Sequence, residues 1–341
     1  MSRWIRCAAM VLALAIGSHA QAQETTPALV AAAKKEGKVV WYTSVDVKVA
    51  EAVAQAFRAE YPGVEVEVER SGSERVLQRI NQEYQSNIYN VDVVNSSDAS
   101  HFLFWKQQKW LAQHTPPDVL KFPAQHRDPE GYYATWRATL SVIGYNTNLV
   151  DAKDAPTGYL DLLDPKWKGK LCKSHPGYSG TSLTGTYAIV KALGWDYLEK
   201  LSKQGVQQLQ STTATPKSIA SGERAVMVDG NEYNMFIEID NKSPVKIVYA
   251  KEGTPFVTSP SAIFAQAPHP NAARLFENFI FTAKAQQLTV DKGGTRSIHP
   301  DVKEPANRTP LSQIKLLPDD PAGMLPQIAE IKKRYTALFG N

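Results

Sequence analysis

Serine and threonine residues are the groups in this chain whose type and spacing best suit the binding of a polar ligand. In NVDVVNSSDASHF, at 90–102, an apolar run changes at once into hydroxyls and a carboxylate. Three such groups occur in the first third of the chain: Thr43 and Ser44, Ser71 and Ser73, and Ser97 and Asp98. Hydroxyls beside the free N–H groups of a helix start suit an anion, and a neighbouring carboxylate suits an amine.

The segments before these groups predict the elements that position them. Apolar or alternating runs at 39–42, 64–69 and 91–94 are typical of strands, and helical stripes lie between them. Ser71 and Glu74 match an S-x-x-E capping box at the start of one helix. This β-α-β-α-β-α order predicts a parallel sheet covered by helices, whose ligands bind at the carboxyl ends of the strands. The hydroxyl groups should therefore share a pocket, although each alone would indicate only a helix cap.

A second α/β unit with similar chemistry follows. The stretch KLCKSHPGYSGTS, at 170–182, reads as a strand, a glycine-rich turn and a helix start. Ser179, Gly180 and Thr181 lie at that helix start. A short strand at 225–228 precedes Glu232 and Tyr233. We expect these residues to face the pocket of the first unit.

The amino end predicts export. Residues 1–22 carry Arg3 and Arg6, an apolar run and an Ala-Gln-Ala cleavage pattern, which together indicate a secretory signal peptide. The apolar run is too short for a membrane anchor. Removal of the two arginines, with no acids, lowers the formal charge from +4 to +2. That charge is too weak to favour nucleic acid or a membrane surface as a partner.

Enzymatic signatures are missing from the sequence. It contains no G-x-S-x-G, H-x-x-x-H or C-x-x-C pattern and no phosphate-binding lysine loop. Cys172, the one cysteine after the signal segment, lies three residues before His175, so the two side chains would point to opposite faces of a strand. We interpret Cys172 as a buried, inert thiol. The sequence thus predicts no catalytic residue and no cofactor, with an exported hydrolase or a protein-binding scaffold as alternatives.

Several stretches resemble a known family. They are EGKVVWYTSVD, NVDVVNSSDASHF, VIGYNTNLV, LLDPKWKGKL, HPGYSGTS and PHPNAARLFENFIFTAKAQQ. Together they are similar to the type II periplasmic solute-binding proteins of ABC importers, in the branch that includes ferric-iron-binding proteins. The resemblance implies an α/β fold of two lobes, each a mostly parallel sheet flanked by helices, that close on a ligand.

The resemblance also implies how the chain is divided. Lobe one would comprise 24–140 plus 256–320, lobe two 141–255, and 321–341 would form a C-terminal helix. Two hinge strands, near 141–145 and 260–264, would join the lobes. Such a protein is a periplasmic monomer that passes a small-molecule solute to an inner-membrane permease and its ATPase.

Ferric iron is one solute that the resemblance suggests. The iron-binding relatives carry two adjacent tyrosines, a histidine and a glutamate as ligands. This chain has Tyr233 without a second tyrosine, and Ser97 stands in place of the glutamate. Only Tyr233, Glu232 and Asp98 remain as candidate iron ligands, so a ferric-iron-binding protein is the alternative rather than the first prediction.

The first prediction is a small anionic or zwitterionic solute of the phosphonate, aminophosphonate or phosphate-ester type. Hydroxyls and backbone amides would hold its anionic end, and Glu232 or Asp98 would hold a cationic end. The predicted ligand-binding residues are Thr43, Ser44, Ser71, Ser73, Ser97 and Asp98 in lobe one, and Ser179, Gly180, Thr181, Glu232 and Tyr233 in lobe two. Arg70 and Arg75 flank the second hydroxyl group and are expected to be solvated.

Overall fold

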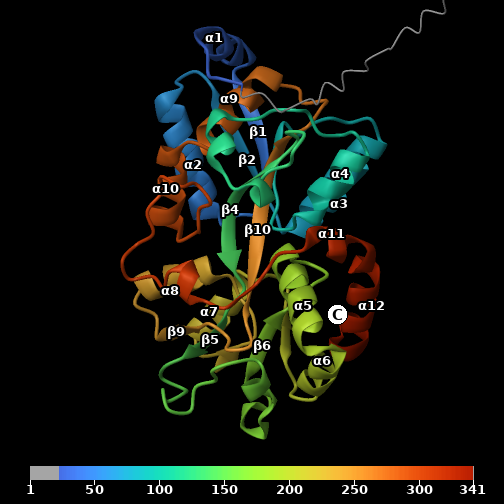
Figure 1. Cartoon of the computed structure of the whole chain (residues 1–341), viewed down its shortest axis with the longest axis vertical. Coiled ribbons are helices and arrows are strands. Elements are labelled where there is room, and N and C mark those ends of the chain that lie inside the picture. The colour runs from blue at the N-terminus through green and yellow to red at the C-terminus, as the bar shows by residue number, and fades with distance from the viewer. Residues whose placement is uncertain (1–22, 341) are drawn as a thin grey trace, which may run out of the picture.

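The computed structural model describes residues 23–340 and shows two α/β units, one above the other in Figure 1. The predicted signal peptide lies outside these residues. The upper unit is built on a six-stranded sheet, and the lower unit on a five-stranded sheet. This arrangement confirms the predicted two-lobed α/β fold. No helix within 23–340 has the length and apolar character needed to cross a membrane.

The upper sheet has the strand order β11-β10-β3-β1-β2, with β4 paired to β10. Its strands are β1 (Lys38–Thr43), β2 (Glu65–Arg70), β3 (Val93–Asn95), β4 (Ala134–Leu140), β10 (Thr254–Ile263) and β11 (Leu316–Leu317). Its helices are α1 (Pro27–Glu36), α2 (Val47–Glu60), α3 (Ser73–Gln85), α4 (Ser100–Gln107), α9 (Pro270–Ile280) and α10 (Ala283–Gly293). The parallel pairing of β1 with β2 and β3 follows the prediction, whereas β10 runs antiparallel to both β3 and β4.

The lower sheet has the order β7-β6-β8-β5-β9. Its strands are β5 (Ile143–Asn146), β6 (Leu171–Ser174), β7 (Gln207–Leu209), β8 (Val226–Met227) and β9 (Val245–Val248). Its helices are α5 (Gly180–Leu193), α6 (Trp195–Ser202), α7 (Ala214–Ala220), α8 (Glu232–Asp240) and α12 (Ile328–Phe339). A short helix α11 (Pro321–Met324) precedes α12, and 3-10 turns occupy Pro117–Lys121, Ala124–His126, Leu160–Leu163, Pro165–Trp167, Leu311–Gln313 and Leu325–Gln327.

Local sequence explains the starts of two helices near the site, α2 and α5, but not that of α3. Asp46 caps α2 by accepting a hydrogen bond from the Lys48 N–H group, and the stripe Val49, Val53 and Phe57 is buried. The capping box predicted at Ser71 is wrong, because α3 begins at Ser73 and its N-cap is Gly72, which has no side chain to cap it. The Glu74 carboxylate is therefore free to contact other groups.

Each unit has its own apolar core. In the upper unit the Trp41 ring lies 5.4 Å from Trp136 and 5.2 Å from Phe276, between centroids. In the lower unit Tyr159 and Tyr335 are buried with the residues around β5 and β6. A further buried cluster, which contains Leu140 and Phe256 of the upper unit and Met227 of the lower unit, lies where the two units meet and connects their cores.

Two neighbouring crossings join the sheets. The chain leaves the upper sheet after β4 and enters the lower one at β5, and it returns between β9 and β10. The Ser141 N–H group donates to the Pro255 carbonyl at 2.9 Å, so the crossings lie side by side. The segment 260–264, expected at a hinge, lies in and just after β10, whose last residues pair with β3 inside the upper sheet. The predicted lobe boundaries at 140 and 255 stay predictions.

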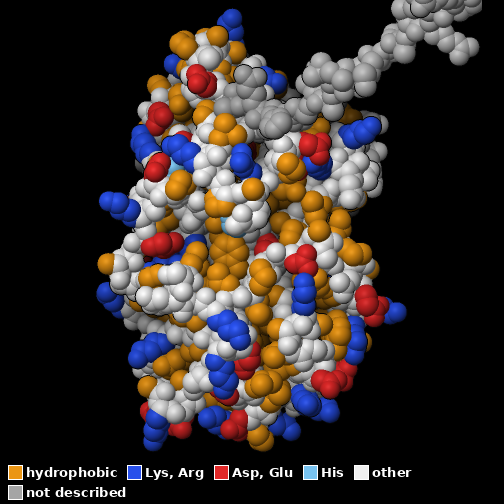
Figure 2. All heavy atoms as spheres, in the orientation of Figure 1, with side chains coloured by type: hydrophobic (Ala, Val, Ile, Leu, Met, Phe, Trp, Pro, Cys, Tyr) orange, Lys and Arg blue, Asp and Glu red, His pale blue; other side chains and the backbone are white. Residues whose placement is uncertain are grey.

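Charges of both signs are mixed over the face of the molecule drawn in Figure 2, without a large field of one sign. This distribution agrees with the low formal charge of the sequence.

Candidate functional site

A narrow cleft lies between the two units. It is lined by six of the residues predicted from the sequence, namely Ser44, Ser73, Ser97, Ser179, Thr181 and Tyr233. The ends of the upper strands and the start of α5 therefore do face one another. This placement is what the parallel-sheet argument predicts for residues at the carboxyl ends of strands.

Three other predicted residues lie beside the cleft rather than along it. The Thr43 hydroxyl is turned into the sheet, where it lies 3.4 Å from Asn95 Oδ1 and accepts from the Val45 N–H group at 3.2 Å. Ser71 lines a separate surface hollow next to Arg75. The Gly180 N–H group donates to Ser73 Oγ at 2.6 Å, so Gly180 forms the contact between the units.

The two carboxylates expected to hold a cationic group point elsewhere. Asp98 Oδ1 accepts hydrogen bonds from the Ser100 N–H and hydroxyl groups at 2.8 and 2.5 Å. Glu232 forms a bidentate ion pair with Arg296, at 2.7 Å for both contacts, and also accepts from the Tyr249 hydroxyl at 2.6 Å. Within the described part of the chain, no aspartate or glutamate lines the cleft.

Arg137 is a charged cleft residue that the sequence reasoning missed. It lies on β4, is almost completely buried, and its Nε atom has no hydrogen-bond partner within 23–340. The centroid of the Tyr233 ring lies 5.6 Å from the Arg137 guanidinium carbon. Burial lowers the pKa of Arg137 below its usual value. A signal was available, since an arginine within the apolar strand ATWRATL is expected to be buried and to need a partner.

Arg70 adds a second cation to the same cleft. Its Nε atom donates to the Val45 carbonyl at 3.1 Å, which fixes the side chain at the end of β2. The residue is exposed, as expected, but it also lines the cleft. No ion pair of Arg70 is found within the described residues, so its charge is available to a ligand.

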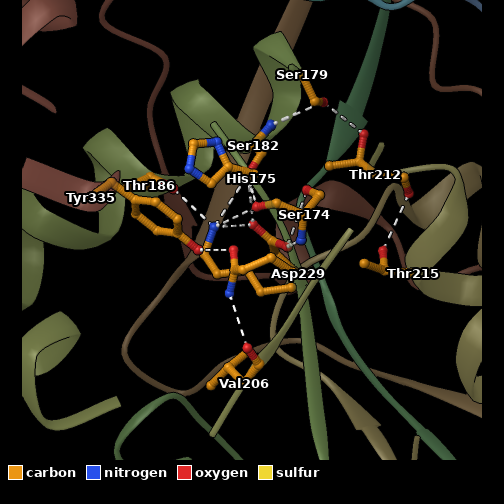
Figure 3. Close-up of polar contacts among 12 residues, drawn as sticks. Ser174, His175, Ser179, Ser182, Thr186, Val206, Thr212, Thr215, Asp229 and Tyr335 are labelled. Atoms are coloured by element: carbon orange, nitrogen blue, oxygen red, sulfur yellow. Dashed lines mark hydrogen bonds and ion pairs between the residues drawn. The ribbon is translucent and has the colours of Figure 1, made fainter. Parts of the chain in front are cut away.

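Polar groups of the lower unit complete the lining. Ser179 is the N-cap of α5 and its hydroxyl lies 3.0 Å from Thr212 Oγ1, as drawn in Figure 3. The Asn231 amide donates to Thr212 Oγ1 at 3.1 Å, and its own Oδ1 has no hydrogen-bond partner among residues 23–340. The residues at 211–213, Tyr178 and Asn231 were not predicted. They come from loops whose approach to α5 depends on the tertiary fold.

A buried ion pair joins Lys173 to Asp229 in the lower unit, and Figure 3 labels Asp229 with its neighbours Ser182 and Thr186. Lys173 Nζ lies 2.7 Å from Asp229 Oδ2 and donates to Thr186 and Ser182 hydroxyls at 2.9 and 3.2 Å. The pair therefore ties β6 and the end of β8 to the first two turns of α5. Cys172, next to Lys173, is buried, and burial raises the pKa of its thiol to about 12, so the thiolate that would react is disfavoured.

The candidate iron ligands do not converge. Tyr233 lines the cleft, whereas Glu232 is paired with Arg296 and Asp98 lies on the far side of the Ser73–Gly180 contact. Burial raises the pKa of Tyr233 even though Arg137 is nearby, which disfavours the phenolate. The cleft thus combines two arginines, hydroxyls and amides, which is the chemistry of an anion receptor.

Comparisons with known proteins agree with this fold. The sequence model of a family described as bacterial extracellular solute-binding proteins matches residues 90–314. The Fe(3+)-binding periplasmic protein of Serratia marcescens is 21% identical over 239 residues, which cover 66% of this chain and 68% of that protein.

Solved structures show the same architecture. The periplasmic binding protein AfuA from Actinobacillus pleuropneumoniae, with exogenous fructose-6-phosphate bound, superposes with a TM-score of 0.81 at 20% identity, covering 89% of this chain and 98% of that one. Iron-bound HitA from Pseudomonas aeruginosa has a TM-score of 0.75 at 20% identity, covering 87% and 99%. At these identities the likeness shows the fold alone.

Proposed function

Since this chain belongs to the family of bacterial extracellular solute-binding proteins, we propose that it captures a small anionic solute between its two units and delivers it to an ABC importer. The periplasm is the proposed location and a single chain the proposed working form. The proposed solute is a phosphate ester or a phosphonate, held by Arg70, Arg137 and the hydroxyls of both units. The molecule binds and releases this solute without changing it.

The buried guanidinium of Arg137 carries this proposal. A charge taken out of water costs several kcal/mol unless an opposite charge compensates it. Within the described residues Arg137 has no carboxylate partner, and the cleft beside it contains a second arginine and no acid. An anion entering the cleft supplies the missing partner, and the planar guanidinium suits two oxygens of one phosphoryl group.

The lack of acidic side chains in the described lining of the cleft narrows the class of predicted solute. An aminophosphonate would need a carboxylate for its ammonium group, and the two predicted ones, Glu232 and Asp98, do not line the cleft. The cleft therefore favours a solute with negative charge only. The fructose-6-phosphate bound to AfuA is an example of such a solute in a protein of the same fold.

The experiment is a binding panel measured by thermal shift and calorimetry. The panel contains fructose 6-phosphate, inorganic phosphate, methylphosphonate, 2-aminoethylphosphonate and ferric citrate. We expect a phosphate ester or phosphonate to raise the melting temperature, because a solute that binds only the folded state stabilises it. The bound solute should be recovered unchanged, whereas a hydrolase would release a product.

Arg137→Gln tests the residue on which the proposal rests. Truncating one partner of a buried charge pair costs about 2–5 kcal/mol, so affinity for the anion should fall by roughly 30-fold or more. Arg58→Gln, on the outer helix α2, is the matched control and should bind as the native protein does. Native affinity in Arg137→Gln, or a thermal shift with ferric citrate alone, would overturn the proposal.

A further inference from the structure

The first three residues of α3 each contact a different element of the lower unit. Ser73 Oγ accepts a hydrogen bond from the Gly180 N–H group, at the start of α5, at 2.6 Å. Glu74 forms an ion pair with Lys332 on α12, and Arg75 donates to the Gln210 side chain, just after β7, at 3.2 Å. Every one of these contacts joins the upper unit to the lower unit.

Lys332 belongs firmly to the lower unit. Its helix α12 buries Tyr335 in the lower core, and the Tyr335 hydroxyl donates to Gln208 Oε1 at 2.9 Å. Arg334, the residue before Tyr335, forms an ion pair with Glu199 on α6 at 2.8 Å. The Glu74–Lys332 ion pair therefore cannot persist if the two units move apart.

Glu74 is held in place on its other side by the upper unit. Its Oε1 atom lies 3.2 Å from His101 Nε2, and the same ring nitrogen lies 3.4 Å from Asp98 Oδ2. All three side chains are buried, and their ligand atoms lie within 4.8 Å of one another, a combination that can hold a metal ion. Here the Lys332 ammonium group provides the cation from the opposite unit.

The charges around Glu74 make this contact strongly ionic. Burial raises the pKa of Glu74, but its hydrogen bond to His101 and the charges of His101 and Lys332 outweigh burial and hold the pKa at about 2. Burial lowers the pKa of His101, yet the Asp98 and Glu74 carboxylates raise it overall. Burial is the main cause that raises the pKa of Asp319, which accepts a hydrogen bond from Thr258 on β10, and the Asp98 charge raises it further. Glu74 is thus ionised at neutral pH.

We propose that the Glu74–Lys332 ion pair sets the balance between the open and closed forms, and so tunes solute affinity from outside the cleft. Neither residue lines the cleft. The apparent affinity of a protein that must close on its ligand scales with the fraction of closed molecules. Loss of Lys332 leaves Glu74 buried with one cation fewer in the closed form, whereas water reaches it in the open form. The part of this inference that concerns affinity rests on the proposed function.

The test compares Lys332→Met with Lys333→Met, without any solute. Methionine keeps the apolar stem of the side chain and removes the charge, and Lys333 is an exposed neighbour on the same helix. Spin labels on exposed cysteines introduced at Glu51, on α2, and Lys200, on α6, report the distance between the units by pulsed electron spin resonance. Urea unfolding verifies that every variant is folded.

We expect Lys332→Met to shift the distance distribution toward longer values, and Lys333→Met to match the native protein. Glu74→Gln should give the same shift, and the double variant should give no more than either single change, because the two residues act through one contact. With fructose 6-phosphate as the probe, Lys332→Met should release it about tenfold faster, on the general rule that such changes act on dissociation.

Unchanged distances in Lys332→Met, or additive effects in the double variant, would overturn the inference. The distance measurement needs no solute, so it is independent of the binding panel. If no anion in the panel binds but the distances shift, the proposed function fails while the ion pair keeps its conformational role.

Discussion

The Glu277 carboxyl, on α9, is buried in the upper unit, where it lies 2.5 Å from the Ser261 hydroxyl. Ser261 Oγ also lies 3.1 Å from the Val94 carbonyl and can donate its single proton there. Burial raises the pKa of Glu277 to about 8, more than the hydrogen bond lowers it. A protonated Glu277 that donates to Ser261, which in turn donates to Val94, satisfies all three groups.

The protonation of Glu277 makes the free energy of unfolding depend on pH. The ordinary pKa of the group is 4.5 and the folded value is about 8, so between these values the folded state keeps a proton that the unfolded state loses. Stability should therefore be greatest below pH 4.5 as far as this group is concerned, and fall as pH rises toward 8, by at most about 1.4 kcal/mol per pH unit. Glu277→Gln should remove this slope in urea unfolding from pH 5 to 8.

Glu51→Gln, on the exposed face of α2, is the control for this experiment and should keep the native slope. A Glu277→Gln profile parallel to that of the native protein would show that Glu277 is ionised in the folded state.

At the residue scale, the sequence predicts the hydroxyls of the site better than its charges. Ser44, Ser97 and Thr181 follow from their position after a strand or at a helix start. The roles of Glu232 and Arg137 do not follow from position, because the partner of Glu232 is Arg296, 64 residues away, and Arg137 has none within the described chain. A buried charge is assigned only when the groups around it are known.

At the element scale, Gly180 at the start of α5 lies in close contact with the upper unit. A Cβ atom on Gly180 would lie 2.6 Å from Asp98 Cβ and 3.0 Å from the Asp98 nitrogen. The contact therefore needs glycine for close approach rather than for an unusual backbone angle. Any side chain at 180 would separate the two units at this point.

Gly180→Ala should favour the open form without weakening the fold. Alanine is a better helix former than glycine, so urea stability should stay the same or rise. The distance between labels at Glu51 and Lys200 should lengthen because the methyl group blocks closure. Ala192→Ser, at the exposed end of the same helix, should leave the distances unchanged. Native distances in Gly180→Ala would show that Asp98 moves aside at little cost.

The order of the first elements is predictable, and their later partners are not. Alternation and helical stripes identify β1, α2, β2, α3 and β3, because these patterns are local. The antiparallel strand β10 pairs with β3 through Ser261 and Asn95, which are 166 residues apart. Such a pairing depends on where the whole lower unit returns the chain, so no local pattern shows it. The contacts of Glu74 with His101 and Lys332 likewise could not be predicted from a local pattern.

At the scale of the whole molecule, the lower unit is completed by the end of the chain. Tyr335 and Ile331 on α12 are buried, and the Tyr335 ring centroid lies 5.0 Å from Lys173 Nζ. The buried ion pair behind the cleft is therefore covered by a helix that begins 155 residues after Lys173. This dependence was not predicted, since the sequence predicts only a C-terminal helix at 321–341.

Removal of residues 328–341 should destabilise the lower unit selectively. Without α12, Lys173 and its neighbours lose an aromatic cover, and loss of large buried side chains typically costs several kcal/mol each. Hydrogen exchange should show lost protection in β6 and β7 while β1 and β2 remain protected, because β1 and β2 pack in an apolar cluster to which no residue of α12 belongs. Equal loss of protection in both sheets would show that the cores unfold together.

The position of β10 has a consequence for how the newly synthesised chain folds. A chain that emerges amino end first presents β1, β2 and β3 long before residues 254–263, which must fill the place beside β3. During that interval the sheet has an open edge of unpaired backbone groups, which is a template for aggregation. The upper sheet must therefore wait until residue 263 of 341 has been made, and a chaperone that shields this edge would raise the yield of native protein.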